Sequence, residues 1–312
     1  MMDAITNWIK GHFGDIEYEE FSEYDDLEEE TENQGAAGPS VEGPTEPQRR
    51  SGQIIAFMSG KGGAGKTSIA VNVANYYSEM NKKVLLVDCD MNTNGATAFF
   101  RTGRAELFED SATILTFHKI LLAYQDELQP ANIEALNSLN LVCLNTNNSK
   151  NYHFLPANVD DGDFDEQTVA NDLLQKLEEH YFSKWRTSYD VIILDFSAGG
   201  AKITEYLSKL PDKICIVMNP DGISRRIVRT RLRFVFRNCN LNNIVCCVNK
   251  RNWYKRSVNV DALFNEFPGF INSNKFKDRY VAGLMIEASN PILWRRLSKI
   301  ANNVYRERVF RR

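Results

Sequence analysis

The sequence lacks any uninterrupted apolar run of about 18 residues, so we expect no membrane-spanning helix. It starts Met-Met-Asp-Ala, with no cationic stretch ahead of an apolar one, which predicts no secretory signal. None of its 6 cysteines forms a Cys-x-x-Cys pair, and most of them lie in apolar runs. This pattern is typical of reduced core cysteines in a cytoplasmic protein, and it favours neither a disulfide framework nor a zinc site.

Charge is distributed unevenly along the 312 residues, although the net charge is only −4. Residues 1–50 carry 14 acidic and 3 basic side chains, whereas residues 219–312 carry 6 acidic and 20 basic ones. An acidic head and a strongly basic last third suggest a polyanionic partner, an internal electrostatic clasp, or both.

Residues 1–50 are expected to form an acidic, largely disordered segment. Residues 17–32 are mostly acidic and residues 35–47 are rich in Gly, Pro, Ser and Glu, so they bury too little apolar surface to offset their ordering entropy. Residues 4–16 fit either a short amphipathic helix, for a partner or a membrane surface, or a terminal helix packed on its own domain. The apolar side chains at helical spacing there are Ile5, Trp8, Ile9, Phe13 and Ile16.

From residue 53 onward, short apolar runs alternate with helical segments. Continuous apolar runs separated by helices are typical of a parallel sheet that is covered on both faces. We therefore expect residues 51–312 to form an α/β domain with a mostly parallel, doubly wound sheet and helices on both faces. The runs are Ile54–Met58, Val84–Val87, Leu139–Leu144, Val191–Leu194, Ile214–Met218 and Ile244–Val248.

The first run ends in a glycine-rich loop, Ser-Gly-Lys-Gly-Gly-Ala-Gly-Lys-Thr-Ser at residues 59–68, and a helical pattern follows. Such a loop lets backbone N–H groups surround phosphate oxygens at a helix N-terminus. Lys66 is predicted to reach the β and γ phosphates of a nucleotide, and the Thr67 hydroxyl to bind Mg²⁺. A loop with a purely structural role is the alternative. The predicted phosphate-contacting residues are Gly60, Gly62, Gly63, Ala64, Gly65, Lys66, Thr67 and Ser68.

A second lysine inside this loop, Lys61, makes the motif more specific. With it, the loop resembles the deviant Walker A motif of the ParA/MinD family of P-loop ATPases, and the resemblance extends over about residues 53–305. It implies a P-loop fold, ATP and Mg²⁺, and a homodimer formed on ATP binding in which Lys61 crosses to the nucleotide of the second subunit. The alternative is a solvated loop lysine in a monomeric NTPase.

The second apolar run ends in Asp88-Cys89-Asp90, which resembles the switch I region of that family. The resemblance implies that Asp90 orients the attacking water and that Asp88 supports the Mg²⁺ ligands. Met91 and Asn92 depart from the usual Pro-Gln. Both aspartates acting only as turn formers is the alternative.

The run 191–194 is followed by a terminal aspartate, Asp195, in a Walker B pattern that predicts Mg²⁺ binding. The residues after it resemble switch II, in which Gly200 is implied to sense the γ-phosphate through its backbone. Farther along, Asn249 stands where the family recognises its base, which implies contact with adenine. A guanine-binding site is expected to carry Asp where Asn252 stands, so the sequence favours ATP.

Residues 224–238 follow a helix-start pattern at Asp221 and combine two opposed stripes at helical spacing. Rows of arginine without interleaved acids suit phosphate contacts. The resemblance implies that this part of the fold binds DNA nonspecifically, as it does in ParA-type proteins. An ordinary solvated face is the alternative. The apolar stripe is Val228, Leu232, Val235 and Cys239, and the candidate DNA-binding residues are Arg226, Arg229, Arg233 and Arg237.

The last predicted helix, residues 292–309, has an apolar side at Leu293, Leu297, Ile300 and Val304. MinD-like proteins end in an amphipathic membrane-binding helix, but this stripe is expected to pack on the sheet. Basic residues at its end remain candidates for anionic lipid or DNA. They are Arg306, Arg308, Arg311 and Arg312.

Together these patterns predict an ATPase that dimerises on ATP binding and hydrolyses ATP slowly, with stimulation by an activating or cargo adaptor protein. The predicted output is ParA-like: it positions plasmid or chromosomal DNA, or a protein complex, through nonspecific DNA binding on the nucleoid. A MinD-like ATPase, peripheral on an anionic membrane and placing a division, flagellar, pilus or secretion component, is the alternative. A metal-cluster carrier or nitrogenase-like reductase shares the fold, but it needs paired cysteines.

Overall fold

The computed structural model describes residues 52–125, 136–144, 151–159, 171–199, 202–219, 221–240, 243–249, 271–272 and 291–305. The chain divides into two compact units, Met1–Gln48 and Arg49–Arg312, and every described residue belongs to the second. The predicted segment at residues 4–16 and the rest of residues 1–50 therefore lie outside the described residues.

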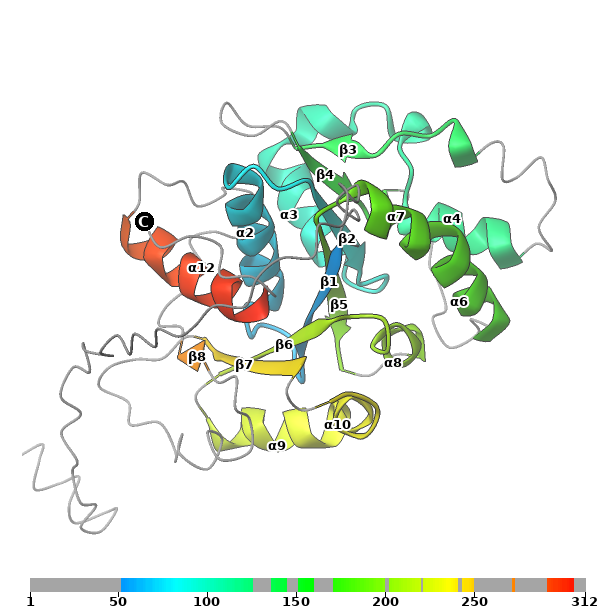
Figure 1. Ribbon diagram of the computed structural model, residues 1–312. Coiled ribbons are helices and arrows are strands. Elements are labelled where there is room, and N and C mark those ends of the chain that lie inside the picture. Colours follow the sequence, from blue (N-terminus) through cyan, green and yellow to red (C-terminus); the bar gives the residue numbers. More distant parts are fainter. Residues whose placement is uncertain are drawn as a thin grey trace, which may run out of the picture. The chain divides into compact units, whose positions relative to one another are not determined.

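The second unit is built on one eight-stranded sheet in the order β3-β4-β2-β5-β1-β6-β7-β8 (Figure 1). All neighbouring strands pair in parallel except β3 and β4, which pair antiparallel. The strands are β1 (Gln53–Ser59), β2 (Val84–Cys89), β3 (Val142–Cys143), β4 (Tyr152–Leu155), β5 (Val191–Ala198), β6 (Lys213–Met218), β7 (Ile244–Val248) and β8 (Ile271–Asn272).

Helices cover both faces of this sheet because the side chains of its central strands alternate between two apolar cores. In β1, for example, Ile54 and Met58 belong to one core and Ile55 and Phe57 to the other. The helices α2 (Lys66–Glu79), α3 (Gly95–Gly103) and α12 (Pro291–Val304) contribute to the second core. The first core takes α4 (Phe117–Gln125), α6 (Asn171–Leu177), α7 (Ser183–Ser188), α8 (Lys202–Leu207), α9 (Gly222–Arg231) and α10 (Arg233–Asn238). A π-helical turn, η3 (Glu178–Phe182), joins α6 to α7, and 3₁₀ turns η1 (Ala105–Phe108) and η2 (Ser111–Thr113) follow α3.

The strand order reverses beside β1. From β1 the chain passes through α2 to β2 on one side, and later strands β6, β7 and β8 add on the other. In open parallel sheets, ligands bind at the carboxyl ends of the strands at such a reversal. The fold therefore places the ends of β1, β2 and β5 together.

The predicted α/β class and the sheet with helices on both faces are confirmed. The run 139–144 was predicted too long: only Val142–Cys143 is a strand, and it pairs antiparallel at the edge. The expectation missed β4, where His153 interrupts the apolar residues, and the two-residue β8. The terminal helix ends at Val304 instead of residue 309, and residues 306–312 lie outside the described ones.

The expected helix over 224–238 starts as predicted but is not continuous. Asp221 caps it by accepting a hydrogen bond from Ser224 N, and the helix breaks at Leu232, whose ψ of 24° departs from helical geometry. The apolar stripe is nevertheless continuous, since Val228, Leu232 and Val235 are all buried. Two short helices thus bury one face against the sheet.

The cysteines agree with the expectation only in part. Within the described residues all six are free thiols, and four of them are buried, but Cys143 is exposed and Cys239 is half-buried. Cys143 lies on the edge strand β3, where its neighbour Val142 is buried and Cys143 is exposed. Of the helices that the structure describes, none has the length and apolar composition needed to cross a membrane.

Candidate nucleotide-binding site

The glycine-rich loop connects β1 to α2 and leaves the start of that helix open. Gly65, the residue before α2, has a φ of 87°, and no side chain among the described residues caps the helix there. The uncapped N–H groups of a first helical turn are a favourable site for phosphate. At Gly62 and Gly63 an added Cβ would meet nothing within 4 Å, so the crest of the loop is open as well.

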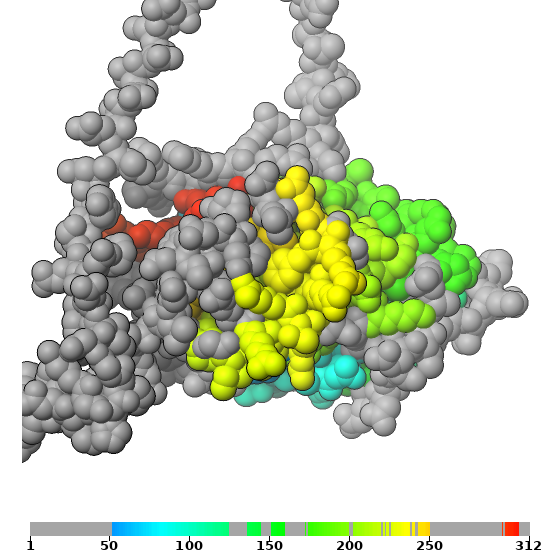
Figure 2. All heavy atoms as spheres, turned by 90° about the horizontal axis from the view of Figure 1, so that it is seen from below, coloured from blue at the N-terminus to red at the C-terminus, as the bar shows by residue number. Residues whose placement is uncertain are grey.

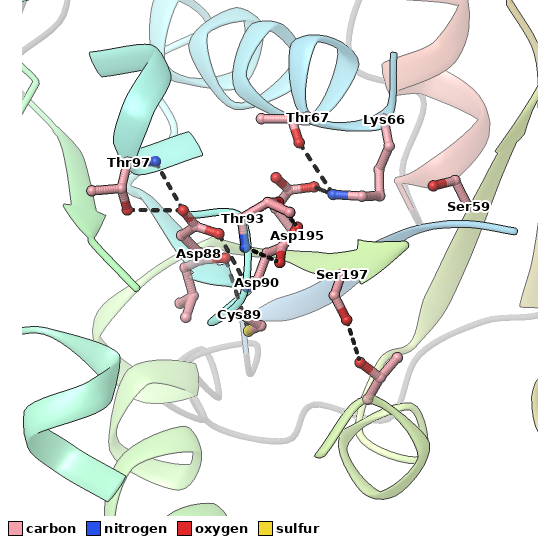
Figure 3. Close-up of polar contacts among 12 residues, drawn as sticks. Ser59, Lys66, Thr67, Asp88, Cys89, Asp90, Thr93, Thr97, Asp195 and Ser197 are labelled. Carbon is pink, nitrogen blue, oxygen red and sulfur yellow. Dashed lines mark hydrogen bonds and ion pairs between the residues drawn. The ribbon is translucent and has the colours of Figure 1, made fainter. Parts of the chain in front are cut away.

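Lys66 lies under the loop and joins the two halves of the predicted site (Figure 3). Its Nζ forms an ion pair and hydrogen bond with Asp195 Oδ1 of β5, and it donates to Thr67 Oγ1 at 3.1 Å. The Lys66 side chain is only 6% exposed and Asp195 is fully buried. The structure thus brings Lys66, Thr67 and Asp195 together although 129 residues separate the first from the last.

The carboxylates at the ends of β2 and β5 meet because Asp88 and Asp195 are register partners in parallel strands. Burial raises the pKa of Asp195, while Lys66 opposes that effect. Asp195 Oδ2 is buried and has no hydrogen-bond partner among the described residues. An unpaired buried carboxylate oxygen is costly unless a cation or a donor satisfies it.

This arrangement fits the Mg²⁺ that the motifs imply. Mg²⁺ prefers oxygen ligands and is commonly held by one or two protein groups together with substrate phosphates. Asp195 Oδ2 and the Thr67 hydroxyl are such groups. In the described part of the chain, no group of three or more His, Cys, Asp or Glu side chains could hold a metal ion.

Asp88 is fully buried and serves a structural network. Its Oδ2 accepts hydrogen bonds from both Thr97 N and Thr97 Oγ1 at 2.8 Å, and its Oδ1 accepts one from Asp90 N at 3.1 Å. Burial, reinforced by the neighbouring Asp195 carboxylate, raises the pKa of Asp88 to about 7. Asp88 therefore lies beside the predicted Mg²⁺ site and fixes α3 next to it.

Asp90 lies in the same region, but its carboxylate folds onto its own loop. One oxygen accepts from Thr93 N at 3.0 Å and the other from the Thr93 hydroxyl (Figure 3). This is the geometry of an Asp-turn, which is the alternative role expected for a carboxylate here. Orientation of an attacking water by Asp90 stays a prediction.

Asn249 follows β7 and contacts the phosphate loop directly. It is fully buried and donates through Nδ2 to Ala64 O at 2.8 Å. A Cβ at Gly65 would lie 2.2 Å from this Nδ2, so only glycine permits the approach. The predicted contact with adenine is not tested; the structure adds that Asn249 holds the loop from beneath. Asn252 lies outside the described residues.

Lys61 lies in the same loop, and its side chain is half-buried, 34% exposed. Its Nζ lies 3.7 Å from Asp221 Oδ2, at the start of α9. Ser59 Oγ donates to Lys61 O at 3.1 Å and steadies the loop backbone. The crossing of Lys61 to a second subunit stays a prediction.

The predicted switch II follows β5. Gly199 has a φ of 103° and donates from its N to Ser59 O at 3.0 Å, which ties the end of β5 to the end of β1. The hydroxyls of Ser197 and Thr204 lie 3.4 Å apart. Gly200, the predicted γ-phosphate sensor, lies outside the described residues.

The four candidate DNA-binding arginines, Arg226, Arg229, Arg233 and Arg237, are all exposed, and we call them the arginine face. Figure 2 looks at the side on which α9 and α10 lie in Figure 1, and the yellow atoms of this segment are open to solvent there. Asp221 is the only acid between residues 221 and 240, and it lies at the helix start. The sequence expectation of one apolar and one cationic stripe is therefore confirmed.

Several residues of the site were not assigned a role by the sequence. Thr93 and Thr97 bind the two switch I aspartates, Asp221 binds Lys61, and Arg231 NH1 donates to Gly60 O at 3.4 Å. An Asp followed three residues later by Thr, as in Asp90–Thr93, is a local turn signal that could have predicted one of these contacts.

Comparison with known proteins supports the motif-based interpretation. A family model described as an AAA domain, AAA_31, matches residues 52–235. The chlorophyllide reductase 35.5 kDa chain of Rhodobacter capsulatus is 34% identical over 80 residues, which are 26% of this chain and 24% of that protein. The chain thus matches only about a quarter of the length of this curated relative.

Solved structures of low sequence identity share the fold. The ParA family ATPase of Chlorobium tepidum is 17% identical, with 83% of this chain and 100% of that chain covered and a TM-score of 0.57. The MinD of Pyrococcus horikoshii with Mg-ADP is 20% identical (81% and 96% covered, TM-score 0.56). The MinC:MinD complex of Aquifex aeolicus gives 17% identity (81% and 95% covered, TM-score 0.58).

More than half of the chain matches the AAA model, and the sheet and loop agree with the ParA and MinD structures. The glycine-rich loop, Lys66, Thr67 and Asp195 stand together at the carboxyl ends of the strands, as the loop motif requires. The chain therefore belongs to the AAA_31 family of AAA domains and has the P-loop fold of ParA and MinD ATPases.

Proposed function

We propose that this protein is an ATP-dependent dimerising switch of the ParA type, whose ATP-bound dimer binds DNA nonspecifically to position a cargo. The observation that carries the proposal is the convergence of Lys66, Thr67 and Asp195 at an open glycine-rich loop, with the second lysine, Lys61, half-buried in the same loop. One lysine serves the nucleotide of its own subunit, and the other serves the nucleotide of a second subunit.

In this proposal, different residues of the site bind the phosphates, hold Mg²⁺, support the loop and orient the attacking water. The loop N–H groups and Lys66 bind the β and γ phosphates, and Thr67 and Asp195 hold Mg²⁺, which neutralises charge on the phosphates when bound. Asn249 keeps the loop in shape from beneath. Asp90, once released from Thr93, orients the water that attacks the γ-phosphorus. The bond between that phosphorus and the bridging oxygen then breaks.

We expect ATP hydrolysis to be slow because of the position of Asp90. Both carboxylate oxygens of Asp90 accept hydrogen bonds from Thr93, which hold the side chain on its own loop and compete with a water. A partner that stabilises the released switch I loop would speed hydrolysis. We propose that an activating or cargo adaptor protein acts in this way.

The choice of DNA over membrane rests on which faces are exposed. The arginine face is exposed on α9 and α10, with its apolar stripe buried. The apolar side of α12 is also buried, at Leu297, Ile300 and Val304, and Tyr77 OH donates to Ala301 O at 2.7 Å. These side chains are therefore not available for the MinD-like alternative, in which the helix would insert into an anionic membrane.

The test compares the two surfaces directly. Purified protein loaded with ATP or ADP is mixed with duplex DNA and, separately, with vesicles that contain phosphatidylglycerol, and its oligomeric state is followed by light scattering. We expect an ATP-specific dimer that binds DNA and leaves the vesicles free, with Asp90→Ala prolonging the dimer. A chain that stays monomeric with ATP overturns the switch, and ATP-dependent binding to vesicles instead of DNA establishes the MinD-like alternative.

A further inference from the structure

The helix that carries the arginine face also contacts the nucleotide loops, and it does so at three places. At its start, Asp221 Oδ2 lies 3.7 Å from Lys61 Nζ. At its middle, a Cβ on Gly60 would lie 2.8 Å from Val228 N, so the loop backbone rests directly on α9. At its end, Arg231 NH1 donates to Gly60 O.

The contact at the start differs from the other two because it involves Lys61, the lysine that is predicted to cross to a second subunit. Asp221 is the N-cap of α9: its Oδ1 accepts from Ser224 N at 2.6 Å and its Oδ2 from Ser224 Oγ at 2.8 Å. The same Oδ2 faces Lys61. One carboxylate therefore fixes the helix start and holds the lysine in its own subunit.

We propose that Asp221 is a positioning residue that holds Lys61 in cis and must release it before Lys61 can cross to the nucleotide of a second copy of this chain. The inference rests on the proposed function, because it assumes an ATP-dependent dimer. Formation of that dimer exchanges the Lys61–Asp221 pair of each subunit for contacts between Lys61 and phosphate. The pair is thus a brake on dimerisation at the start of the helix that carries the arginines.

The surroundings of the pair suit a face that a second copy covers. Lys61 and Asp221 are 34% and 42% exposed, so both are accessible without local unfolding. Two residues along, Ile223 is 70% exposed, one of only two large apolar side chains that stand out to solvent in the described part of the chain. An exposed apolar side chain beside a charged pair that must exchange partners is favourable at an interface between subunits.

The size of the effect follows from the exposure of the pair. Exposed ion pairs contribute little, and two of them are released for each dimer formed. We therefore expect loss of the pair to tighten the ATP dimer by about 2- to 30-fold at low salt. The gain should shrink as salt rises, since screening weakens the pair in the wild-type chain.

The test uses Asp221→Asn in the full-length protein. Asparagine caps helices as well as aspartate does, so this variant keeps an oxygen for Ser224 N at the start of α9 and removes the charge that holds Lys61. The Ser224 hydroxyl, which donates to Oδ2 in the wild type, can instead accept from the amide Nδ2. The matched control is Asp172→Asn, which removes one charge from another exposed pair, with Lys176 Nζ 3.8 Å from Asp172 Oδ2. Thermal unfolding of both variants verifies that the fold is retained.

Dimerisation with ATP and Mg²⁺ is measured by analytical ultracentrifugation at 50 and 300 mM salt. Tighter dimerisation of Asp221→Asn than of the wild type and the control, with a smaller difference at high salt, is the expected result. Unchanged dimerisation of Asp221→Asn overturns the proposed brake and leaves the proposed function standing. Weaker dimerisation does the same, and it would show that Asp221 contributes contacts within the dimer. A wild-type chain that stays monomeric overturns the proposed function and the brake with it.

Discussion

The phosphate-loop end of the sheet and the arginine-bearing helices both concentrate charge, but they hold it in opposite ways. At the loop, Lys66 and Asp195 are buried and form an ion pair. On α9 and α10 the guanidinium groups of the arginine face are exposed to solvent and salt. Buried charge acts through exact partners at short range, whereas exposed charge acts through its sum over a surface. The first region should respond strongly to single substitutions and the second only to several at once.

The largest effect is expected from Lys66. Lys66→Ala should weaken ATP binding by on the order of 100-fold or more, because a charge-assisted contact to phosphate is lost. Lys61→Ala should leave ATP binding within about threefold, since the ion pair of Lys61 is a partly exposed one with Asp221. Equilibrium binding of a fluorescent ATP analogue distinguishes them.

A control separates ligand binding from folding in this comparison. Lys66→Ala leaves Asp195 buried without its partner, which costs about 3–5 kcal/mol of stability. The double variant Lys66→Ala/Asp195→Asn should recover most of that stability without recovering ATP binding. Recovered binding in the double variant would show that Lys66 acts only by neutralising Asp195.

On the exposed side, four charges must be changed together. Reversing Arg226, Arg229, Arg233 and Arg237 to Glu should weaken binding to every DNA sequence alike. If each arginine contacts one phosphate, the slope of log affinity against log salt falls by about 3 to 4 in magnitude. Fluorescence anisotropy with two unrelated duplexes over a salt series measures both quantities.

The matched control reverses exposed lysines elsewhere. Lys83 and Lys184 are exposed and precede β2 and β5, at the opposite ends of the strands from the site. Lys83→Glu/Lys184→Glu should change the salt slope much less than reversing any two arginines of the arginine face. Equal changes would mean that only the net charge of the protein matters.

Much of this contrast could be predicted from the sequence because it follows from local patterns. Each of these patterns spans a short stretch of the sequence, and the structure has each where it was expected. They are the loop motif, the terminal Asp195 and the two stripes of residues 224–238. The strands beneath them were found because fully buried parallel strands are continuous apolar runs.

The parts that could not be predicted depend on contacts between distant segments. Asn249 reaches Ala64 across 185 residues, and Lys61, after β1, meets Asp221, after the neighbouring strand β6. No spacing rule links such positions before the strand order is known. The break at Leu232 is similar: the stripe continues through it, so periodicity alone indicates one helix where the structure has two.

A smaller effect concerns pH and the buried carboxylates. The pKa of Asp88 is raised from 3.8 to about 7 in the folded chain, so between these values the folded state binds more protons than the unfolded state. Its contribution to stability is therefore fully present below the unfolded pKa and is lost as the pH rises through about 7. The free energy of unfolding of the wild type should fall over this range.

Asp88→Asn cannot ionise and should show a shallower fall. Some slope should remain, because burial also raises the pKa of Asp195. Chemical denaturation without nucleotide from pH 4 to pH 8 measures the slope, with Asp172→Asn as an exposed carboxylate control. Parallel slopes for Asp88→Asn and the wild type would show that Asp88 does not titrate in this range.

The smallest effect is expected from the acidic head. If it competes with DNA for the arginine face, the arginines are partly paired with acids, as the buried charges at the loop are. Residues 17–32 hold 10 acidic side chains on the same chain as the arginines. A tethered segment has an effective concentration on the order of millimolar, so attraction of millimolar strength would weaken DNA binding by only about twofold.

Replacing these acids by their amides in the full-length chain should therefore tighten DNA binding about twofold at 20 mM salt and leave it unchanged near 150 mM, where screening removes the attraction. Anisotropy titrations of both proteins against the same duplex measure the difference. Equal affinities at 20 mM salt would show that the acidic head does not compete for the arginine face.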